Sequence, residues 1–476
     1  MEQFLSRRGL LAGGGALGLL AACSSGSTST SASASGTPSP SGAAGPNPLV
    51  PFAPFAAPVF NDEALFALGA AAARTAEVGE VLMTAQAITQ RTGNPQDPTK
   101  DSFTAYVEEF RRTGARLAEL AASAAEEGFQ QTANARYLRS SMYNAQALFF
   151  VLGGADPGKE EADFDRCDTA WQAALDSWDV GVERFEVTGA GHRIPCYFLS
   201  PAGNGRRPTV IISEGSDGQN VETMQFGVRA GLERGYNVVL FEGPGQMSLL
   251  FKKRIPFTAQ WDEVVSPIVK EVRARDDVGS VAVVGISFGG MLCARVAART
   301  PGVDAVVLQP GAYSFPALWG DQKDVDLVRS VQDAPEAEQR KAAEELNKGF
   351  QQAWPTLSPL SQFTIYKRGE IMSPTMLDDA RAGRAPTDYY GVLKAMLPFD
   401  FTEDYRQIQI PTMVTSNEGD EFFAGQSKEA FDLLRLPDAK KQLLELTAAQ
   451  GAQLHDQPMG PQVAQEYVFD WLAQWM

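Results

Sequence analysis

The chain has 476 residues, of which 44% are hydrophobic and 21% charged, and its formal net charge at pH 7 is −17. This length and balance are typical of a globular protein with two or three structural units. The acidic excess argues against nucleic acid or an anionic membrane surface as partner, and it fits an enzyme that meets neutral or cationic small molecules.

The first 23 residues have the pattern of an export signal. Arg7 and Arg8 form a twin-arginine pair, and a short, Gly-rich, weakly apolar stretch follows. Residues 20–23, LAAC, resemble a bacterial lipobox, in which Cys23 becomes the lipidated first residue of the mature protein. Plain cleavage at a small-residue site, with Cys23 incidental, is the alternative. We therefore expect export through the twin-arginine route and an extracytoplasmic protein anchored to the membrane by lipid alone.

Two further regions precede the first strand. Residues 24–58 are mostly Ser, Thr, Ala, Gly and Pro, a composition that cannot offset its ordering entropy, so we expect a flexible tether. Residues 59–181 are expected to form a helical domain. Its four helical segments are expected at 65–88, 102–127, 133–152 and 164–178.

From residue 182 to 476, short β-branched runs alternate with helical segments. This alternation predicts the α/β class, with a mostly parallel sheet covered by helices on both faces. Residues 312–400 interrupt it with helical, charged, Pro-containing sequence, which we interpret as a lid insertion. The strands are expected at 184–187 and 194–199 (a hairpin), then at 209–213, 237–241, 278–284, 303–308, 410–416 and 442–446.

The pentapeptide Gly285-Ile286-Ser287-Phe288-Gly289 lies between an apolar run and a helix-like stretch. A strand, a G-x-S-x-G turn and a helix together form the nucleophile elbow of an α/β-hydrolase, with Ser287 as the nucleophile. An ordinary Gly-rich strand-to-helix turn is the competing interpretation. A serine hydroxyl is a poor nucleophile near neutral pH, so it needs a positioned base.

The chain contains only two histidines, His192 and His455. The α/β-hydrolase fold orders its catalytic residues as serine, acid and histidine along the chain. His455 follows Ser287 and is therefore the candidate base. His192 precedes the elbow in an expected hairpin turn, and we interpret it as a structural residue.

The acid is expected just beyond the strand at 410–416, where residues 417–422 read NEGDEF. Asp420 follows a glycine at the usual offset, and we favour it over Glu418 and Glu421. It would orient the imidazole and stabilise the imidazolium. The alternative is that all three acids form a solvated loop tip.

A tetrahedral intermediate needs two backbone N–H donors. Phe288, which directly follows the nucleophile, is the candidate for one donor. The loop after residues 209–213 is expected to supply the second donor, for which we choose Ser216, with Gly215 as the alternative. Glu214 precedes this pair, and a carboxylate there opposes negative charge unless it is protonated or turned to the substrate. Glu214 either binds a donor group of the substrate or makes a structural hydrogen bond to the loop backbone.

Three segments carry a family resemblance: 134–143 (NARYLRSSMY), 241–246 (FEGPGQ) and 261–267 (WDEVVSP). They resemble α/β-hydrolases with an N-terminal helical cap, a branch that includes 2,6-dihydroxypseudooxynicotine hydrolase, fungal polyketide-shortening hydrolases and related esterases. That family often reads Asp-Gly-Pro-Gly-Gln-Gly at the second segment, so Glu242 and Met247 depart from it. The resemblance implies that the helical domain caps the site, and that the reaction is either ester hydrolysis or hydrolytic cleavage of a carbon–carbon bond beside a ketone.

We therefore expect an exported serine hydrolase that acts on a carboxylic ester of a small molecule without a cofactor. Hydrolytic carbon–carbon cleavage of a β-diketone-like compound is the first alternative, and an acyl transferase and a non-catalytic cell-surface binding module are the others. No metal site is expected, because Cys167, Cys196 and Cys293 lack metal-ligand spacing, and the last two are expected to be buried. The sequence does not fix the oligomeric state, and a homodimer is one of the alternatives.

Overall fold

The computed structural model describes residues 49–50, 52–319, 321–423 and 425–476. The expected export signal, Cys23 and most of the expected tether lie outside these residues. The last part of the tether prediction is wrong, because Phe55 is only 3% exposed and its ring contacts Phe60 and Tyr106. The Pro-rich composition concealed this aromatic residue, whose burial ties residues 52–58 to the helical unit.

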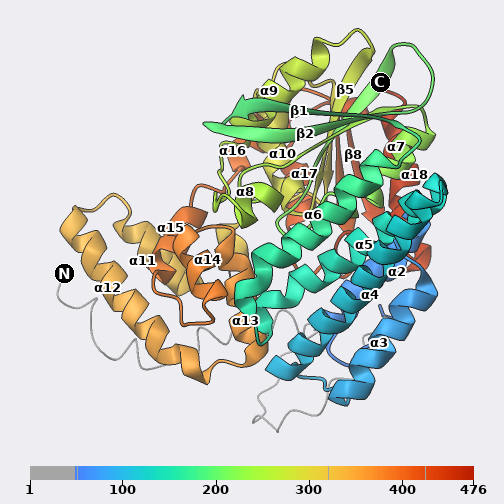
Figure 1. Cartoon of the computed structure of the whole chain (residues 1–476). Coiled ribbons are helices and arrows are strands. Elements are labelled where there is room, and N and C mark those ends of the chain that lie inside the picture. Colours follow the sequence, from blue (N-terminus) through green and yellow to red (C-terminus); the bar gives the residue numbers. More distant parts are fainter. Residues whose placement is uncertain (1–48, 51, 320, 424) are drawn as a thin grey trace.

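A helical unit occupies the N-terminal part of the described chain (Figure 1). The long helices α4 and α5 pack side by side, and α3 and α6 flank them. The expected helix at 65–88 is divided, because a 3-10 turn follows α2 and Arg74 then adopts a left-handed conformation, with φ 62°. The elements are α2 (Pro58–Gly69), η1 (Ala70–Ala73), α3 (Val78–Thr92), α4 (Lys100–Glu126), α5 (Gln130–Phe150) and α6 (Glu160–Asp176).

An eight-stranded sheet forms the centre of the second unit, in the order β1-β2-β4-β3-β5-β6-β7-β8. The first two strands form the expected antiparallel hairpin, β2 pairs antiparallel with β4, and all later pairs are parallel. This confirms the predicted mostly parallel α/β sheet. The strands are β1 (Gly181–Gly189), β2 (His192–Ser200), β3 (Arg207–Ser213), β4 (Asn237–Phe241), β5 (Val278–Ile286), β6 (Ala305–Gln309), β7 (Thr412–Asn417) and β8 (Lys441–Leu446).

Helices cover both faces of this sheet (Figure 1). On one face α7 (Val228–Glu233) packs against α18 (Pro461–Leu472), and on the other α10 (Phe288–Arg299) packs against α9 (Trp261–Arg273) and α16 (Thr402–Gln407). The shorter helices α8 (Met247–Phe251) and α17 (Gln426–Leu433) contact α6 and β7, respectively. The inner strands are buried on both sides, as their continuous apolar runs require.

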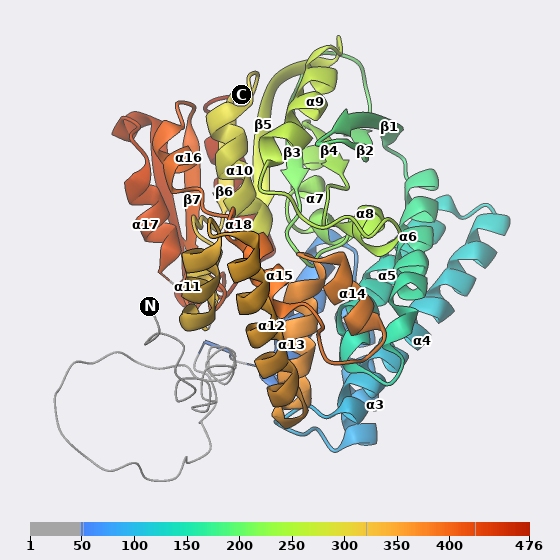
Figure 2. The ribbon, with the colours of Figure 1, turned by 90° about the vertical axis from the view of Figure 1, so that its left-hand side faces the viewer.

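Five α-helices lie between β6 and α16, the helix that precedes β7. They lie beside the N-terminal helical unit, below the sheet in the view of Figure 2. Arg381 of the insertion donates to buried Glu160 of α6 at 2.8 Å, which joins the two helical parts. The inserted helices are α11 (Gln322–Val331), α12 (Glu336–Ala353), α13 (Pro359–Glu370), α14 (Pro374–Arg381) and α15 (Tyr389–Met396).

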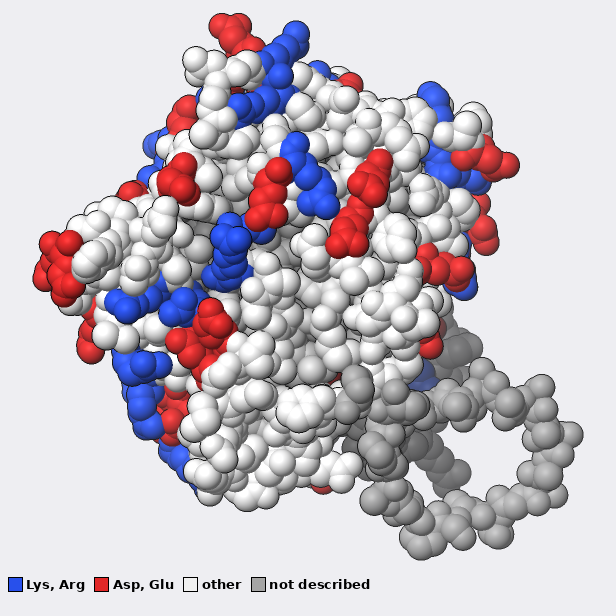
Figure 3. All heavy atoms as spheres, turned by 90° about the vertical axis from the view of Figure 1, so that its right-hand side faces the viewer, with Lys and Arg blue, Asp and Glu red and all other residues white. Residues whose placement is uncertain are grey.

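The outer surface carries charges of both signs. Acidic and basic side chains are intermixed on the face shown in Figure 3, with broad uncharged areas between them. None of the helices in the described residues is long and apolar enough to cross a membrane.

Candidate active site

Ser287 stands at the sharp turn between β5 and α10. Its backbone has φ 52° and ψ −122°, a conformation that L-residues rarely adopt and that is common where a functional side chain is held in place. Its N–H donates to the Gln309 carbonyl at 2.7 Å, which fixes the turn against β6. Gly289 is required because a Cβ there would collide with the carbonyl oxygen of Ser213. The sequence is therefore folded locally as the elbow geometry demands.

Three side chains that are far apart in the chain form one hydrogen-bonded line. Ser287 Oγ lies 2.9 Å from His455 Nε2, and His455 Nδ1 lies 3.2 and 3.1 Å from the two carboxylate oxygens of Asp420. The N–H groups of Phe422 and Phe423 donate to Asp420 Oδ1 at 2.9 and 3.0 Å. The structure thus brings together the serine, the histidine and the acid that the sequence had singled out.

The charges around His455 shift both partners' pKa values. Burial alone would raise the pKa of Asp420, but the His455 charge and the hydrogen bonds to the carboxylate outweigh it, so the pKa of Asp420 is lowered. Burial alone would lower the pKa of His455, but the charges of Asp456 and Asp420 raise it to about 9. The line is therefore electrostatically suited to hold an imidazolium.

The other residues considered from the sequence lie apart from this line. Glu418 turns away, and its carboxylate accepts the Ala448 N–H at 2.8 Å. Glu421 is an exposed residue at the cavity edge and makes no hydrogen bond to His455. His192 lies at the start of β2, opposite Gly189 in the hairpin, and does not line the cavity.

The loop after β3 lies against Ser287, because Ser213 pairs with Gly285 in the sheet register. A Cβ at Gly215 would lie 2.7 Å from the Cβ of Ser287, so only glycine allows this approach. Gln246 Nε2 holds the loop by donating to the carbonyls of Glu214 and Gly215 at 2.6 and 2.9 Å. The loop that contains Ser216 is thereby held beside Ser287, and Ser216 and Phe288 both line the cavity there.

Glu214 is the first residue of this loop, and it is buried, with 4% of its surface exposed. Its Oε1 accepts the Gly215 N–H at 3.2 Å, as the structural interpretation anticipates, whereas its Oε2 has no partner. Burial and the nearby Glu222 charge raise its pKa well above the ordinary value. The raised pKa favours the neutral form of this carboxyl group, which lessens the charge conflict noted for this position.

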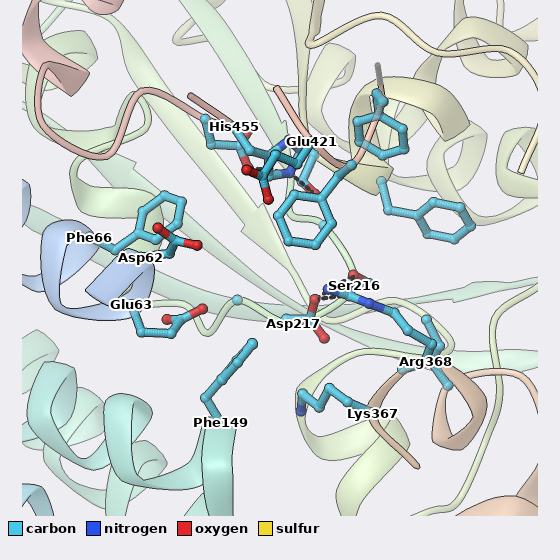
Figure 4. A pocket seen from close by; sticks show the side chains of 18 of the residues that line it. Asp62, Glu63, Phe66, Phe149, Ser216, Asp217, Lys367, Arg368, Glu421 and His455 are labelled. Carbon is cyan, nitrogen blue, oxygen red and sulfur yellow. Dashed lines mark hydrogen bonds and ion pairs between the residues drawn. The ribbon is translucent and has the colours of Figure 1, made fainter. Parts of the chain in front are cut away.

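A cavity of about 230 Å³ opens beside Ser287 and His455. Helix α2, helix α13 and the loops after β3 and β7 supply most of its walls, so both helical parts of the chain contribute (Figure 4). Sequence reasoning missed several of its polar residues. These are Asp62, Glu63, Asp217, Glu222, Lys367, Arg368 and Asp456. Asp217 and Asp456 directly follow candidate site residues, whereas the others lie in segments with no recognisable motif.

Among these residues, Asp456 contacts the histidine directly. Its Oδ2 lies 3.3 Å from His455 Nε2, the same ring atom that contacts Ser287, and its Oδ1 has no partner. Burial raises the pKa of Asp456 to about 7, although the His455 charge acts in the opposite direction. A second carboxyl group thus stands at the reacting end of the imidazole.

Metal and thiol chemistry find no support in the geometry. Within the described residues, no group of three or more His, Cys, Asp or Glu side chains is arranged to hold a metal ion. Cys167, Cys196 and Cys293 are buried and unpaired, and burial raises the pKa of each thiol. The expected burial of Cys196 and Cys293 is confirmed.

Comparison with known proteins agrees with this architecture. A family model described as "Alpha/beta hydrolase family" matches residues 221–456. Alpha/beta hydrolase psoB of Aspergillus fumigatus is 29% identical over 287 residues, 56% of this chain and 61% of the relative. Hydrolase LUC6 of a Fusarium species is 31% identical over 268 residues, 53% of this chain and 60% of the relative. The matched part of the chain thus spans about three fifths of the length of these relatives.

A solved structure has the same fold over most of its length. The crystal structure of the 2,6-dihydroxy-pseudo-oxynicotine hydrolase aligns with a TM-score of 0.58 at 16% identity, covering 86% of this chain and 95% of that one. At this identity the likeness concerns the fold alone. The strand order and the elbow define an α/β-hydrolase fold. Together with the family match, they place this chain in the α/β-hydrolase superfamily.

Proposed function

We propose that the protein is a serine hydrolase that cleaves a carboxylic ester of a small molecule, with Ser287, His455 and Asp420 as its catalytic triad. The observation that carries the proposal is the line from Ser287 Oγ through His455 to Asp420, with contacts of 2.9 and 3.1 Å. The family match and the relatives named hydrolases support hydrolysis as the reaction class.

In the first half-reaction, Ser287 Oγ attacks the ester carbonyl while His455 Nε2 takes its proton. The carbonyl oxygen becomes an oxyanion, which the backbone N–H groups of Phe288 and Ser216 would stabilise. His455 then gives the proton to the leaving alkoxide as the acyl–oxygen bond breaks. Asp420 keeps the imidazole in the required tautomer and stabilises its charged form.

In the second half-reaction, water attacks the acyl-serine. His455 takes the proton of that water and returns it to Ser287 Oγ as the carboxylic acid departs. The net reaction consumes one water for each ester cleaved and needs no metal or cofactor. The two half-reactions use the same groups in the same places.

Hydrolytic carbon–carbon cleavage is the second candidate, and one observation favours it. A carbanion leaving group must be protonated, and two buried carboxyl groups with raised pKa values, Glu214 and Asp456, line the cavity beside Ser287. Each could supply a proton that an alkoxide leaving group would not require. Ester hydrolysis remains the proposed reaction because the triad alone suffices for it.

Turnover measurements test the proposal. Purified protein is assayed with short and long neutral esters and with aromatic β-diketones, and Ser287→Ala and His455→Ala are compared with His192→Ala. Ester turnover that is lost in the first two variants and kept in the third supports the proposal. Turnover of diketones alone would favour the second candidate, and failure to turn over either class would favour a binding module.

We also propose export through the twin-arginine route and lipid attachment at Cys23, on the strength of residues 6–23. Metabolic labelling with an alkyne fatty acid is expected to mark the full-length protein and to be lost in Cys23→Ala. Labelling that persists in this variant would contradict the lipid attachment.

A further inference from the structure

One wall of the cavity is formed by acidic side chains of helix α2. Asp62 and Glu63 point into the cavity from the side opposite Lys367 and Arg368 (Figure 4). Neither carboxylate makes a hydrogen bond or an ion pair with any residue that the structure describes. Because α2 belongs to the helical unit, this wall is independent of the elbow and of the triad loops.

The acidic wall continues toward the nucleophile. Glu222 lies close enough to both Glu63 and Glu214 for its charge to raise their pKa values. Glu214 is 4% exposed and lines the cavity with an unpartnered Oε2. Glu63, Glu222 and Glu214 therefore form a continuous acidic wall from α2 to the loop beside Ser287. We call these three residues together with Asp62 the acidic wall.

The cations of the cavity are already engaged. Arg368 forms an ion pair with Asp217, and Lys367 Nζ lies 2.9 Å from Glu370 Oε1. Neither cation makes an ion pair with a carboxylate of the acidic wall. The cavity thus gathers carboxyl groups without a matching number of available cations, in contrast to the mixed charges on the outer face in Figure 3.

Burial without a counter-charge is costly for carboxylates. Burial and neighbouring acids raise the pKa of Asp62 and of Glu222 to about 7 in each case, and they raise the pKa of Glu63 well above its ordinary value. The charge of Lys367 lowers the pKa of Glu63 and of Glu222 but does not offset these effects. A cation placed among these groups would reverse that effect, because an opposite charge favours the ionised form. A positively charged ligand would therefore stabilise the ionised carboxylates of the acidic wall and bind to them favourably.

Aromatic rings indicate the kind of cation. Phe66 lines the cavity from the same helix as Asp62 and Glu63 and contacts Phe226 edge-on, with ring centroids 6.2 Å apart. Phe149 points toward the acidic wall from below in Figure 4, and its ring already contacts Lys367, whose Nζ lies 5.3 Å from the ring centroid. Faces of aromatic rings attract organic ammonium groups. A metal ion fits less well, because the carboxyl groups of the described residues are not clustered closely enough to share one. The combination of rings and spaced carboxylates suits a bulky ammonium.

We propose that the acidic wall is a subsite for an organic ammonium group of the substrate, so that the preferred substrates are esters carrying a basic or quaternary amine. This proposal rests on the proposed function, because the ester carbonyl is taken to lie at Ser287. Asp62 and Glu63 bind the ammonium group, Glu222 extends the negative potential along the cavity, and Glu214 continues the wall into the loop beside Ser287. The net charge of −17 also favours the approach of cations.

A pair of substrates with the same shape and different charge tests the subsite. Choline phenylacetate and its neutral carbon isostere, 3,3-dimethylbutyl phenylacetate, differ only in the charge of the quaternary centre. We expect kcat/KM to be at least about tenfold higher for the choline ester, a ratio equivalent to about 1.4 kcal/mol. Glu63→Gln and Asp62→Asn are expected to bring this ratio toward one, whereas Glu119→Gln, an exposed acid of α4, leaves it unchanged.

Binding to Ser287→Ala separates the subsite from the chemistry. Calorimetry is expected to show that this variant binds the choline ester more tightly than the isostere, and that Glu63→Gln in the same background removes the difference. Protons should be released on binding at pH 7, because the cation lowers the pKa values of the acidic wall. Release is measured by repeating the titration in buffers of different ionisation enthalpy.

The outcomes are distinct for the two proposals. Equal binding of the two esters, or a preference that survives in both Glu63→Gln and Asp62→Asn, would overturn the subsite even if the esters are hydrolysed. Selective binding without hydrolysis would overturn the proposed function and leave the subsite standing.

Discussion

Asp456 Oδ2 lies 3.3 Å from Nε2 of His455, the atom that contacts Ser287 Oγ at 2.9 Å. Both side chains therefore contact the same ring nitrogen, and the charge of Asp456 is the largest influence raising the pKa of His455. In a serine hydrolase, this contact would control the pH at which the imidazole becomes a free base.

The pH profile of ester hydrolysis should report this contact. The base form of His455 is the active one, so kcat/KM rises as pH increases through its pKa, which is about 9. Asp456→Asn removes a negative charge, lowers that pKa and should move the rising limb to lower pH. Asp438→Asn, which changes an exposed acid that does not line the cavity, is the control for a general change of charge. An unmoved limb in Asp456→Asn would show that Asp456 does not act on His455.

The assignment of the acid can be tested among its neighbours. Asp420→Asn keeps the shape but loses the carboxylate that orients His455, and kcat should fall by about 10³- to 10⁴-fold. Glu418→Gln and Glu421→Gln are matched controls from the same loop, and neither contacts the imidazole. Kinetics of the three variants decide the assignment; a loss confined to Glu421→Gln or Glu418→Gln would move the acid.

Gly215 can be tested by adding a single methyl group. Gly215→Ala places a Cβ 2.7 Å from the Cβ of Ser287, so the loop or the serine must shift. Because oxyanion donors act only when well placed, we expect kcat to fall by about 10²-fold or more. Gly79→Ala in α3, where a Cβ meets nothing within 4 Å, is the control. Full activity in Gly215→Ala would remove this loop from the oxyanion site.

The ion pair between the two helical parts should contribute to stability. Glu160 is fully buried, and Arg381 donates to it at 2.8 Å. Arg381→Ala leaves that carboxylate unpaired, and the free energy of unfolding should fall by about 3–5 kcal/mol. Arg406→Ala, whose partner Glu403 is exposed, should cost at most about 1 kcal/mol. Denaturant unfolding of both variants measures the difference, and equal losses would contradict the account.

The sequence was most informative where function depends on local pattern. The alternation of strands and helices predicted the sheet, and the spacing around Ser287 predicted the elbow, because periodicity and glycine requirements are local properties. The chain order then led to His455, since only one histidine follows the serine. The loop glycine before Asp420 led to this residue as the candidate acid for a similar reason, and the structure places Asp420 in contact with His455.

The remaining features depend on contacts between distant segments. Asp217 meets Arg368 across 151 positions, and no pattern in either segment announces the pair. Asp62 and Glu63 look like ordinary polar positions of a surface helix until α2 is placed against the cavity. The Pro-rich composition around Phe55 gave no sign that this residue is buried. Its contacts with Phe60 and Tyr106 show that the expected tether ends before residue 58.

The most direct test of the central claim is to find where a fluorophosphonate probe reacts. The probe is attacked by an activated serine and leaves a stable phosphonyl adduct, which peptide mass spectrometry can assign to a residue. We predict one adduct, on Ser287, that is absent from His455→Ala and present in His192→Ala. An adduct on another residue, or none on the folded protein, would contradict the assignment of Ser287 as the nucleophile.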